Sequence, residues 1–368
     1  MKINSVIQYI KNELVLFIAA ILAILTSFFA TPKLSYIDFK VLILLFNLMI
    51  VIAAFKEFNI MNYIASIFIK NCSSYKNLTI ALLSICFFSS MIVTNDVSLI
   101  TFVPLTLIIC SSININPIKI IVLETIASNL GSALTPMGNP QNLFLYSYFN
   151  ISPLEFFKIT FPLTLLSLIL LIIIALKGEN YKLDVKVSKV TIKNKRLSII
   201  FFVLFIIILL SVFHLINYKI VFVMTIITTV IFDKKLLIKI DYSLLITFVA
   251  FFIFIGNISS IETIRIFISN ILNNGLNTYI GGIISSQFIS NVPATMLLSG
   301  FTDYYKELLL SVNIGGLGTL IASLASVISY KLYSKEFSNE STTYLKKFTK
   351  YNFIFLIILT PIIYLLIL

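Results

Sequence analysis

The sequence predicts an all-α polytopic membrane protein with two inverted repeats, each containing a re-entrant hairpin and a broken transmembrane helix. Three observations carry this prediction. The chain is 59% hydrophobic and 11% charged, whereas about a quarter of the residues in soluble domains are charged. Several uncharged runs approach the roughly 20 residues with which a helix crosses a bilayer. A polar stretch at 128–142, rich in Gly, Pro and Asn, interrupts one apolar run, and a weaker copy recurs at 313–319.

The polar stretch at 128–142 indicates a site because of its surroundings. A loop that faces lipid would leave backbone N–H and C=O groups unpaired, at several kcal/mol each. Non-helical backbone at membrane depth is tolerated inside protein or beside a water-filled cavity. We therefore expect this stretch to line a binding site.

Composition excludes several classes of function. The net charge of +12 would favour a nucleic-acid partner in a soluble protein, but Lys and Arg gather in loops, where they set membrane topology. We expect a lipid bilayer and no nucleic acid around the chain. Three cysteines without CxxC spacing predict neither a metal site nor a disulfide framework, and we expect no cofactor. One histidine cannot supply the pair of a hydrolytic metal site, so we expect no enzyme.

The first half is predicted to contain two spans, an interfacial helix, a hairpin and a broken helix. The arms of the hairpin flank Thr94-Asn95-Asp96, and the second arm, about 21 Å long, is too short to span comfortably. The expected elements are 14–31, 41–55, 58–70, the arms 78–93 and 97–110, the broken helix 118–130 and 143–149, a span at 154–176, and two further spans at 198–216 and 219–232.

The same order recurs in the second half, which is expected at 243–258, 261–272, the arms 278–289 and 292–301, and a helix at 307–330 interrupted at 313–319. A basic loop at 331–350 and a last span at 352–368 follow. The aligned residues are Asn95 and Asn291, Asn129 and Asn313, Gly131 and Gly315, Thr135 and Thr319, Gly138 and Ala322, Asn142 and Ser326, and Tyr146 and Tyr330. Internal repeats of this kind are typical of secondary transporters.

We expect one transmembrane transporter domain over 1–368. It divides into repeat 1 (about 41–176), a cytoplasmic loop (177–197), connecting helices (198–232), repeat 2 (about 243–330) and a C-terminal helix (352–368). With the N-terminus in the cytoplasm and both hairpins re-entrant, most of the 27 Lys and Arg residues fall on the cytoplasmic side, as positively charged loops do. The hairpins then open to opposite sides, which makes the repeats inverted. The expected location is the bacterial cytoplasmic membrane, as a multi-pass protein.

Four motifs resemble one known group of transporters. They are Thr94-Asn95-Asp96-Val97, the stretch 128–142, Phe254-Ile255-Gly256-Asn257 and Ser290-Asn291-Val292-Pro293-Ala294. In this order, over roughly residues 40–368, they resemble the citrate-transporter-like members of the ion transporter superfamily. That group includes divalent-anion:sodium symporters, arsenite efflux permeases and some sodium/proton antiporters. The resemblance implies hairpins and broken helices that meet at a central site, elevator-type alternating access, and a homodimer as in the best-known branch.

The hairpin tips depart from the divalent-anion branch, whose members resemble one another in a Ser-Asn-Thr motif at both tips. Here the tips read Thr94-Asn95-Asp96 and Ser290-Asn291-Val292. Asp96 places a negative charge where a dicarboxylate would approach. An Asn-Asp tip looks more like the arsenite-permease and sodium/proton-antiporter branches.

The candidate site combines two kinds of ligand. N-termini of half-helices present N–H groups to anions, whereas freed carbonyls and Asn, Thr and Ser oxygens suit Na⁺. Glycines let the backbone approach a ligand, although they also serve close helix packing. The predicted substrate- and ion-binding residues are Thr94, Asn95, Asp96, Asn129, Gly131, Thr135, Pro136, Gly138, Asn139, Gln141, Asn142, Ser290, Asn291, Pro293, Asn313, Gly315, Gly316, Gly318 and Thr319. Apart from Na⁺, no metal is expected.

Two acids within the apolar runs are candidates for proton coupling, Asp96 and Glu124. An Asp at the centre of a span costs about 2.5–3.5 kcal/mol on insertion scales, so it is expected to face a cavity or a partner. Asp96 could instead cap the second hairpin arm. Glu124 lies about one and a half turns before Asn129, and its alternatives are a structural pairing or a carboxyl group that stays protonated.

These observations favour a secondary active transporter of a small ion, above all an anion such as a carboxylate or oxyanion, coupled to Na⁺ or H⁺ by alternating access. The alternatives are a sodium/proton antiporter or an arsenite-type efflux permease, and more remotely a channel. Uphill flux driven by an ion gradient distinguishes a transporter from a channel.

Overall fold

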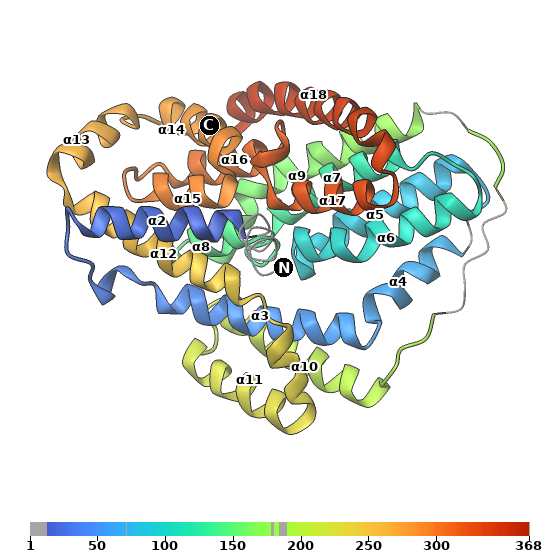
Figure 1. Cartoon of the computed structure of the whole chain (residues 1–368), viewed down its shortest axis with the longest axis horizontal. Coiled ribbons are helices and arrows are strands. Elements are labelled where there is room, and N and C mark those ends of the chain that lie inside the picture. Colours follow the sequence, from blue (N-terminus) through green and yellow to red (C-terminus); the bar gives the residue numbers. More distant parts are fainter. Residues whose placement is uncertain (1–12, 71, 178–179, 184–189, 368) are drawn as a thin grey trace, which may run out of the picture.

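The computed structural model describes residues 13–70, 72–177, 180–183 and 190–367. Within these ranges the regular secondary structure is helical, and most helices run roughly along the long axis of the molecule (Figure 1). Seven of the described helices are long and apolar enough to cross a membrane. The prediction of an all-α polytopic membrane protein is therefore confirmed. The predicted cytoplasmic N-terminal residues Lys2 and Lys11 lie outside the described ranges.

Four helices of the first half begin with side-chain caps, which fix where a helix starts because they accept an otherwise unpaired N–H. The caps are Asp38, Ser74, Asn139 and Ser152 ahead of α3, α5, α8 and α9. The elements are α2 (Leu14–Ser27), η1 (Leu34–Tyr36), α3 (Phe39–Glu57), α4 (Ile60–Ile69), α5 (Tyr75–Val93), α6 (Asn95–Ser112), α7 (Ile118–Gly131), η2 (Ser132–Leu134), α8 (Pro140–Tyr148) and α9 (Pro153–Leu176).

The second half uses the same device, with Asn194, Asn217, Asp241 and Asn274 capping α10, α11, α12 and α14. Its elements are α10 (Lys195–Val212), α11 (Tyr218–Asp233), η3 (Lys234–Lys239), α12 (Tyr242–Ser260), α13 (Glu262–Ile271), α14 (Gly275–Ile289), α15 (Asn291–Ser299), α16 (Tyr305–Gly315), η4 (Leu320–Ala322), α17 (Leu324–Glu336), η5 (Ser338–Glu340) and α18 (Ser341–Ile367).

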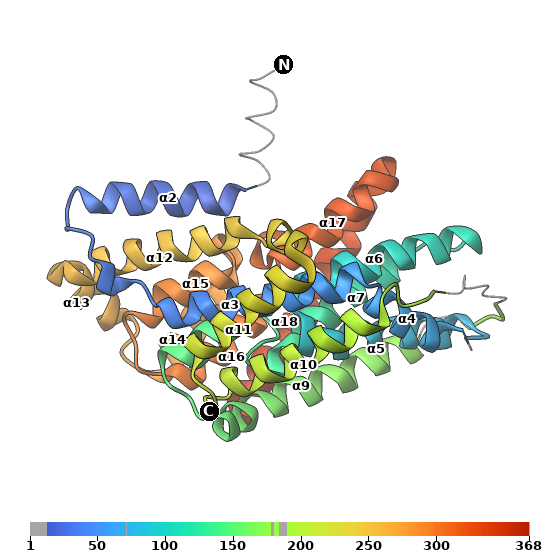
Figure 2. The same ribbon diagram turned by 90° about the horizontal axis from the view of Figure 1, so that it is seen from below.

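One order of elements occurs twice. A long helix, a ten-residue helix, a hairpin and an interrupted helix follow one another as α3, α4, α5–α6 and α7–α8, and again as α12, α13, α14–α15 and α16–α17. The α5–α6 hairpin lies toward one end of the molecule and the α14–α15 hairpin toward the other (Figures 1 and 2). The re-entrance of the hairpins and the inversion of the repeats across a membrane stay predictions.

The first hairpin differs from the prediction in the length of its arms. α5 and α6 contain 19 and 18 residues, and both are long enough to cross a membrane. The turn consists of Thr94 alone, and α6 continues through Pro104 to Ser112, so the expected second arm at 97–110 was too short. The argument that the second arm of the first hairpin is too short to cross a membrane is therefore wrong. α15, the second arm of the other hairpin, is short, with nine residues.

The second interrupted helix breaks later than predicted. Asn313 and Gly315, placed in the break by the sequence, are the last residues of α16. Asn313 continues the helix because its Nδ2 donates to the Leu309 carbonyl one turn earlier (2.8 Å). The backbone leaves the helix beyond Gly315, and Gly318 adopts a φ of +98° that side chains rarely tolerate.

The basic segment 331–350 is helical instead of a loop. α17 extends to Glu336 and α18 begins at Ser341, ten residues or so before the predicted last span. The Lys-rich segment also has an apolar face that packs inside the protein, where Tyr333, Tyr344 and Phe348 are fully buried. Burial of these rings stabilises helices that composition alone assigns to a loop.

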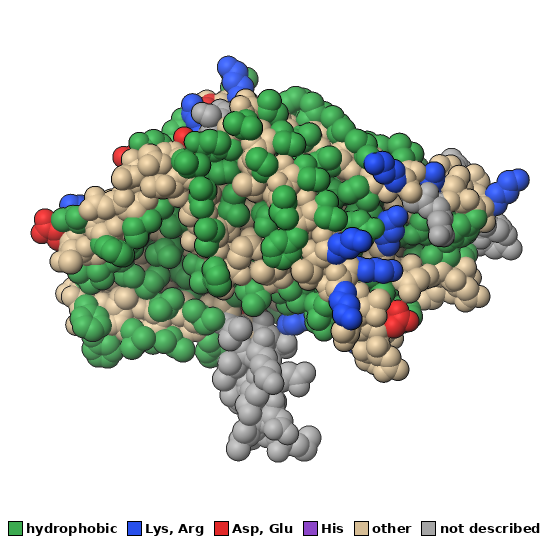
Figure 3. Space-filling model, turned by 90° about the horizontal axis from the view of Figure 1, so that it is seen from above, with side chains coloured by type: hydrophobic (Ala, Val, Ile, Leu, Met, Phe, Trp, Pro, Cys, Tyr) green, Lys and Arg blue, Asp and Glu red, His purple; other side chains and the backbone are tan. Residues whose placement is uncertain are grey.

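The surface carries many exposed apolar side chains. Figure 3 shows them over much of one face, with Lys and Arg gathered toward one end. On α10 and α11 the exposed residues include Ile199, Phe202, Val203, Ile227 and Ile231. A broad apolar band of this kind suits contact with lipid.

Candidate functional site

Both hairpins turn on a single strained residue. Thr94 has φ 75° and ψ 151°, and Ser290 has φ 73° and ψ 152°. This region is almost restricted to glycine, and a residue held there costs of order 1–3 kcal/mol. The surrounding contacts must therefore fix both tips, and such strain is concentrated at functional sites.

The break between α7 and α8 is held by the side chain of Asn142. Its Nδ2 lies 3.1–3.3 Å from the carbonyl oxygens of Ser132, Ala133 and Thr135, which the end of α7 leaves without helical partners. Its backbone N–H donates to Asn139 Oδ1 (2.8 Å), which caps α8. The Asn142 amide thus lies within hydrogen-bonding distance of three carbonyls of the break.

The break between α16 and α17 is held from the hairpin instead. Gln287 Nε2 donates to the Gly315 and Leu317 carbonyls (2.8 and 2.9 Å), and Gln287 Oε1 accepts the N–H of Thr319 (2.9 Å). Gln287 was not among the predicted site residues. Gln287 could have been predicted from the sequence, because it is a polar residue three positions before Ser290 at the tip.

Each break is tied to its hairpin by the same kind of contact. The Thr135 hydroxyl donates to the Met91 carbonyl (2.5 Å), and the Thr319 hydroxyl donates to the Gln287 carbonyl (3.0 Å). Met91 and Gln287 both lie three residues before the strained tip. The predicted correspondence of the two threonines is thus matched by equivalent contacts.

Gly131 and Gly315 also play equivalent parts. A Cβ at Gly131 would overlap the Phe87 carbonyl of α5, and a Cβ at Gly315 would crowd Ser286 and Ile283 of α14. Both glycines therefore allow an interrupted helix to pack against the first arm of its hairpin. This is the packing role that the sequence left as the alternative.

Asn129 joins α7 to the second repeat. Its Nδ2 donates to Ser326 Oγ (3.3 Å), and its Oδ1 accepts from Ser323 Oγ (3.0 Å). All three side chains are at least 96% buried. Ser323 and Ser326, at the start of α17, were not among the predicted site residues.

Asn313 makes the matching contacts with the first repeat. Its Nδ2 donates to Asn142 Oδ1 (2.7 Å), and its Oδ1 accepts from Asn139 Nδ2 (3.1 Å). In the repeat alignment Asn142 corresponds to Ser326, and the same offset pairs Asn139 with Ser323. The two interrupted helices thus interlock through two equivalent sets of hydrogen bonds, and the alignment contained the signal for both serines.

The two tips differ in what their asparagines bind. Asn95 Nδ2 donates to Asn129 Oδ1 (3.0 Å), and Asn95 Oδ1 accepts the N–H of Asp96 (3.0 Å). The Asn291 side chain is only 4% exposed, yet it makes no hydrogen bond to any residue within the described ranges. Its Nδ2 lies against Gly316, where an added Cβ would come within 2.8 Å.

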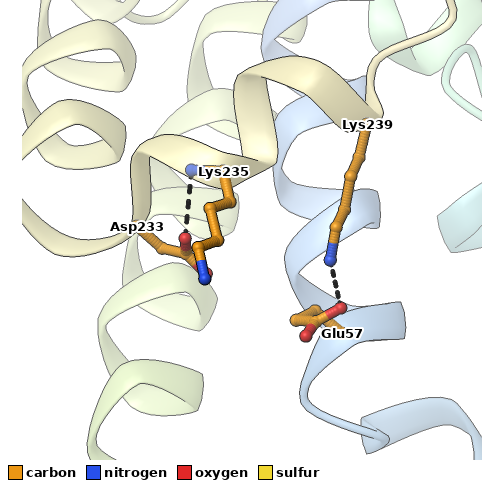
Figure 4. Close-up of polar contacts among 4 residues, drawn as sticks. All are labelled: Glu57, Asp233, Lys235 and Lys239. Carbon is orange, nitrogen blue, oxygen red and sulfur yellow. Dashed lines mark hydrogen bonds and ion pairs between the residues drawn. The ribbon is translucent and has the colours of Figure 1, made fainter.

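A cavity of about 250 Å³ reaches the first tip. Asp96 lines it, and the Asp96 carboxylate makes no hydrogen bond or ion pair with a residue in the part of the chain that the structure describes. The exposed residues Lys56, Lys239 and Asp241 line its open end. Lys239 of η3 forms an ion pair with Glu57 at the end of α3 (Figure 4). The remaining lining residues are Thr94, Met137, Asn139 and Pro140 with apolar side chains of α3, α6, α8, α12 and α17.

Comparison with known proteins identifies the family of the chain. The sequence profile of the citrate transporter family matches residues 5–302. The chain belongs to the citrate transporter family. It is therefore an integral, multi-pass membrane transporter, and the resemblance seen in its motifs is confirmed.

Relatives of this family member include transporters from distant organisms. An uncharacterised transporter of Methanocaldococcus jannaschii is 38% identical over 299 residues, which cover 80% of this chain and 81% of that protein. The inner membrane protein YbiR of Escherichia coli is 30% identical over 248 residues, 66% of each chain. A Dictyostelium discoideum protein that bears the transporter name arsB is 28% identical over 139 residues, 37% of this chain and 24% of that protein.

Some predicted site residues of this family member take no part in the hydrogen bonds between the hairpin tips and the helix breaks. Gln141 is 2% exposed, but its side chain makes no hydrogen bond to a described residue. Pro136 and Pro293 are buried beside the first break and the second tip. Glu124 lies apart from the tips, fully buried in α7, where Thr106 Oγ1 donates to its Oε1 (2.5 Å).

The only histidine lies outside the centre. His214 is exposed in the connection between α10 and α11, and its ring stacks on Tyr146 of α8 at 5.0 Å. Partial burial, and then the Lys40 ammonium 3.1 Å from Nε2, lower the pKa of the His214 imidazole. The neutral form is therefore favoured at pH 7, which fits a packing role.

Proposed function

We propose that this member of the citrate transporter family moves a small anion, a carboxylate or an oxyanion, by alternating access coupled to Na⁺ or H⁺. Four helices (α6, α8, α15 and α17) begin near the tips and breaks, and four (α5, α7, α14 and α16) end there. Helix N-termini favour anions and C-termini favour cations. A centre that offers both suits an anion transported together with a cation.

The observation that carries the proposal is the unpaired Asn291 side chain. Nearly all buried polar groups have a hydrogen-bond partner, and its counterpart Asn95 has two. Gly316 leaves room beside Asn291, since a Cβ there would crowd the amide. An amide held at a strained tip without a partner is a group that can bind a transported ligand.

The test compares Asn291→Ala with Asn95→Ala in proteoliposomes. A thermal-shift screen of citrate, succinate, arsenite, Na⁺ and Li⁺ first identifies what stabilises the wild type. We expect Asn291→Ala to lower uptake of that substrate at least about tenfold with little change in melting temperature, since about 1.4 kcal/mol of lost binding suffices. Asn95→Ala should lower the melting temperature as well, because Asn129 loses a buried donor.

Asn277, exposed on α14 with Nδ2 bonded to Asn273, supplies the control Asn277→Ala. Wild-type uptake by Asn291→Ala would contradict the assignment of the second tip to the ligand.

A second candidate function, cation/proton antiport or arsenite-type efflux, is favoured by Asp96. Its unpaired carboxylate lines the cavity, and an anionic ligand would meet like charge there. Asp96→Asn should then change the Na⁺ or pH dependence of flux. The alternative that Asp96 caps the second arm is wrong, since α6 starts without a side-chain cap. Unchanged ion dependence would therefore contradict the second candidate function.

A further inference from the structure

Glu124 is a fully buried acid that the central site does not use. It is 0% exposed, and one of its two oxygens, Oε2, has no hydrogen-bond partner. No Lys or Arg within residues 13–70, 72–177, 180–183 and 190–367 forms an ion pair with it. Burying an ionised carboxylate without a compensating charge is very costly. The side chain is therefore suited to hold a proton.

The groups around Glu124 come from three other helices. The titratable groups that face it are Cys86 of α5, Cys110 of α6 and Tyr344 of α18. All three are buried and uncharged in their ordinary state. The strongest contact is the Thr106 hydroxyl, which donates to Oε1 and leaves Oε2 as the free position.

Two groups of hydrogen-bonded hydroxyls lie between the segment of α7 that carries Glu124 and the surface. Thr125 Oγ1 donates to Ser329 Oγ (2.7 Å), which lies 3.0 Å from the hydroxyl of Tyr344. Tyr344 stacks on Tyr333 at 4.8 Å between ring centroids. The Tyr333 hydroxyl donates to exposed Glu340 (3.1 Å). Hydroxyl groups both donate and accept, so each group can pass protons. A complete route also needs water between Glu124 and Thr125 and between Tyr344 and Tyr333, which are joined by ring stacking alone.

We propose that Glu124 is a proton-binding site of the transport cycle, separate from the substrate site at the tips, and that protons reach it from the face where Glu340 lies. The proposal rests on the proposed function and specifies H⁺ as a coupling ion. The proton binds Oε2 and leaves as H⁺, so no other reactant is needed.

The position of Glu124 explains how a proton would act on the central site. α7 carries Glu124 and Thr125 in one turn and Asn129 about one turn later, and Thr125 and Asn129 bind Ser329 and Ser326 of α17. A carboxylate formed at Glu124 needs a new donor or water, which requires α7 to move against its neighbours. That movement would disturb the contacts that join the two repeats.

The first experiment follows proton binding without any substrate. Purified wild type, Glu124→Gln and the exposed control Glu262→Gln are reconstituted in lipid, and the C=O stretch of protonated carboxyl groups is recorded by infrared spectroscopy over a pH series. We expect one titrating band to vanish in Glu124→Gln and to persist in Glu262→Gln. An unchanged set of titrating bands in Glu124→Gln overturns the proposal.

The same band tests the route. On transfer to D₂O, the shift of the Glu124 band measures how fast its proton exchanges. Tyr344→Phe should slow this exchange, whereas Tyr330→Phe should not, since the Tyr330 ring joins the same cluster but no hydrogen bond of its hydroxyl to a described residue is present. Equal exchange in both variants overturns the route.

The second experiment asks whether the proton controls the conformation. Ile100→Cys places a thiol on the wall of the cavity, and its labelling by a water-soluble maleimide reports access. We expect the labelling rate to change with pH at least about fivefold, the lower end of typical coupling. With Glu124→Gln added, the rate should stay at its low-pH value. A pH response that survives this substitution overturns the coupling. Neither readout involves the substrate, so a failure of the proposed anion transport would leave both intact.

Discussion

Single residues at the hairpin tips store strain that the rest of the site must oppose. The sequence predicted Thr94 and Ser290 as ligand-binding residues, and the structure adds that both occupy a backbone region almost restricted to glycine. Sequence could not supply this, because neither residue type favours positive φ. Their shared geometry follows from the contacts of each tip with its break.

The strain at Thr94 predicts an unusual response to glycine. Thr94→Gly should relieve about 1–3 kcal/mol of strain and lose about 0.5–1 kcal/mol to the greater freedom of the unfolded chain. The melting temperature should therefore stay equal or rise, while transport falls because the tip loosens. The matched control Thr101→Gly, in the interior of α6, should instead cost at least about 0.3 kcal/mol, the difference in helix propensity between Thr and Gly. A Thr94→Gly protein that melts well below wild type would show that the tip is unstrained.

The interrupted helices are the elements that the sequence predicted best. Gly, Pro and Asn within an apolar run indicated that both helices are interrupted. Asn139 is recognisable as the N-cap of α8 because Asn is a common capping residue and Pro140 follows it at the first helical position. The position of the second break was missed by a few residues, since the bond from Asn313 to a carbonyl of its own helix depends on side-chain direction. Gln287 was missed because it acts from another element, at a distance that no local pattern contains.

Asn142 and Gln141 allow the role of one break to be tested between neighbours. Both are buried, but only Asn142 bonds the open carbonyls and Asn313. Asn142→Ala should lower the free energy of unfolding by at least about 1–3 kcal/mol, because a buried donor and several carbonyls lose their partners. Gln141→Ala removes a side chain of similar size without breaking a bond between described residues, so it should cost less. Equal losses in chemical or thermal unfolding would mean that packing, and not the amide, holds the break.

At the scale of the whole molecule, the two repeats meet through equivalent hydrogen bonds but differ in what they leave free. The first tip presents an unpaired carboxylate at Asp96, and the second presents an unpaired amide at Asn291. The cavity reaches only the first of these two groups. The proposed alternating access would require a rearrangement that opens the second tip. One ion pair beside the open end of the cavity can be used to test such a movement.

That contact is the ion pair between Lys239 of η3 and Glu57 of α3 (Figure 4). Lys239 lines the open end of the cavity together with Lys56 and Asp241. The ion pair ties the start of α12 to α3, so its loss should let the cavity widen. Both side chains are about 40% exposed, and exposed pairs contribute about 0–1 kcal/mol. Lys239→Gln in the Ile100→Cys background should thus speed maleimide labelling by no more than about fivefold, with an effect that shrinks at high salt. Lys235→Gln removes the same charge from the same segment, where the backbone N–H and not the ammonium binds Asp233, and should leave labelling unchanged. If both substitutions speed labelling equally, the general charge of η3 controls access, and the pair with Glu57 does not.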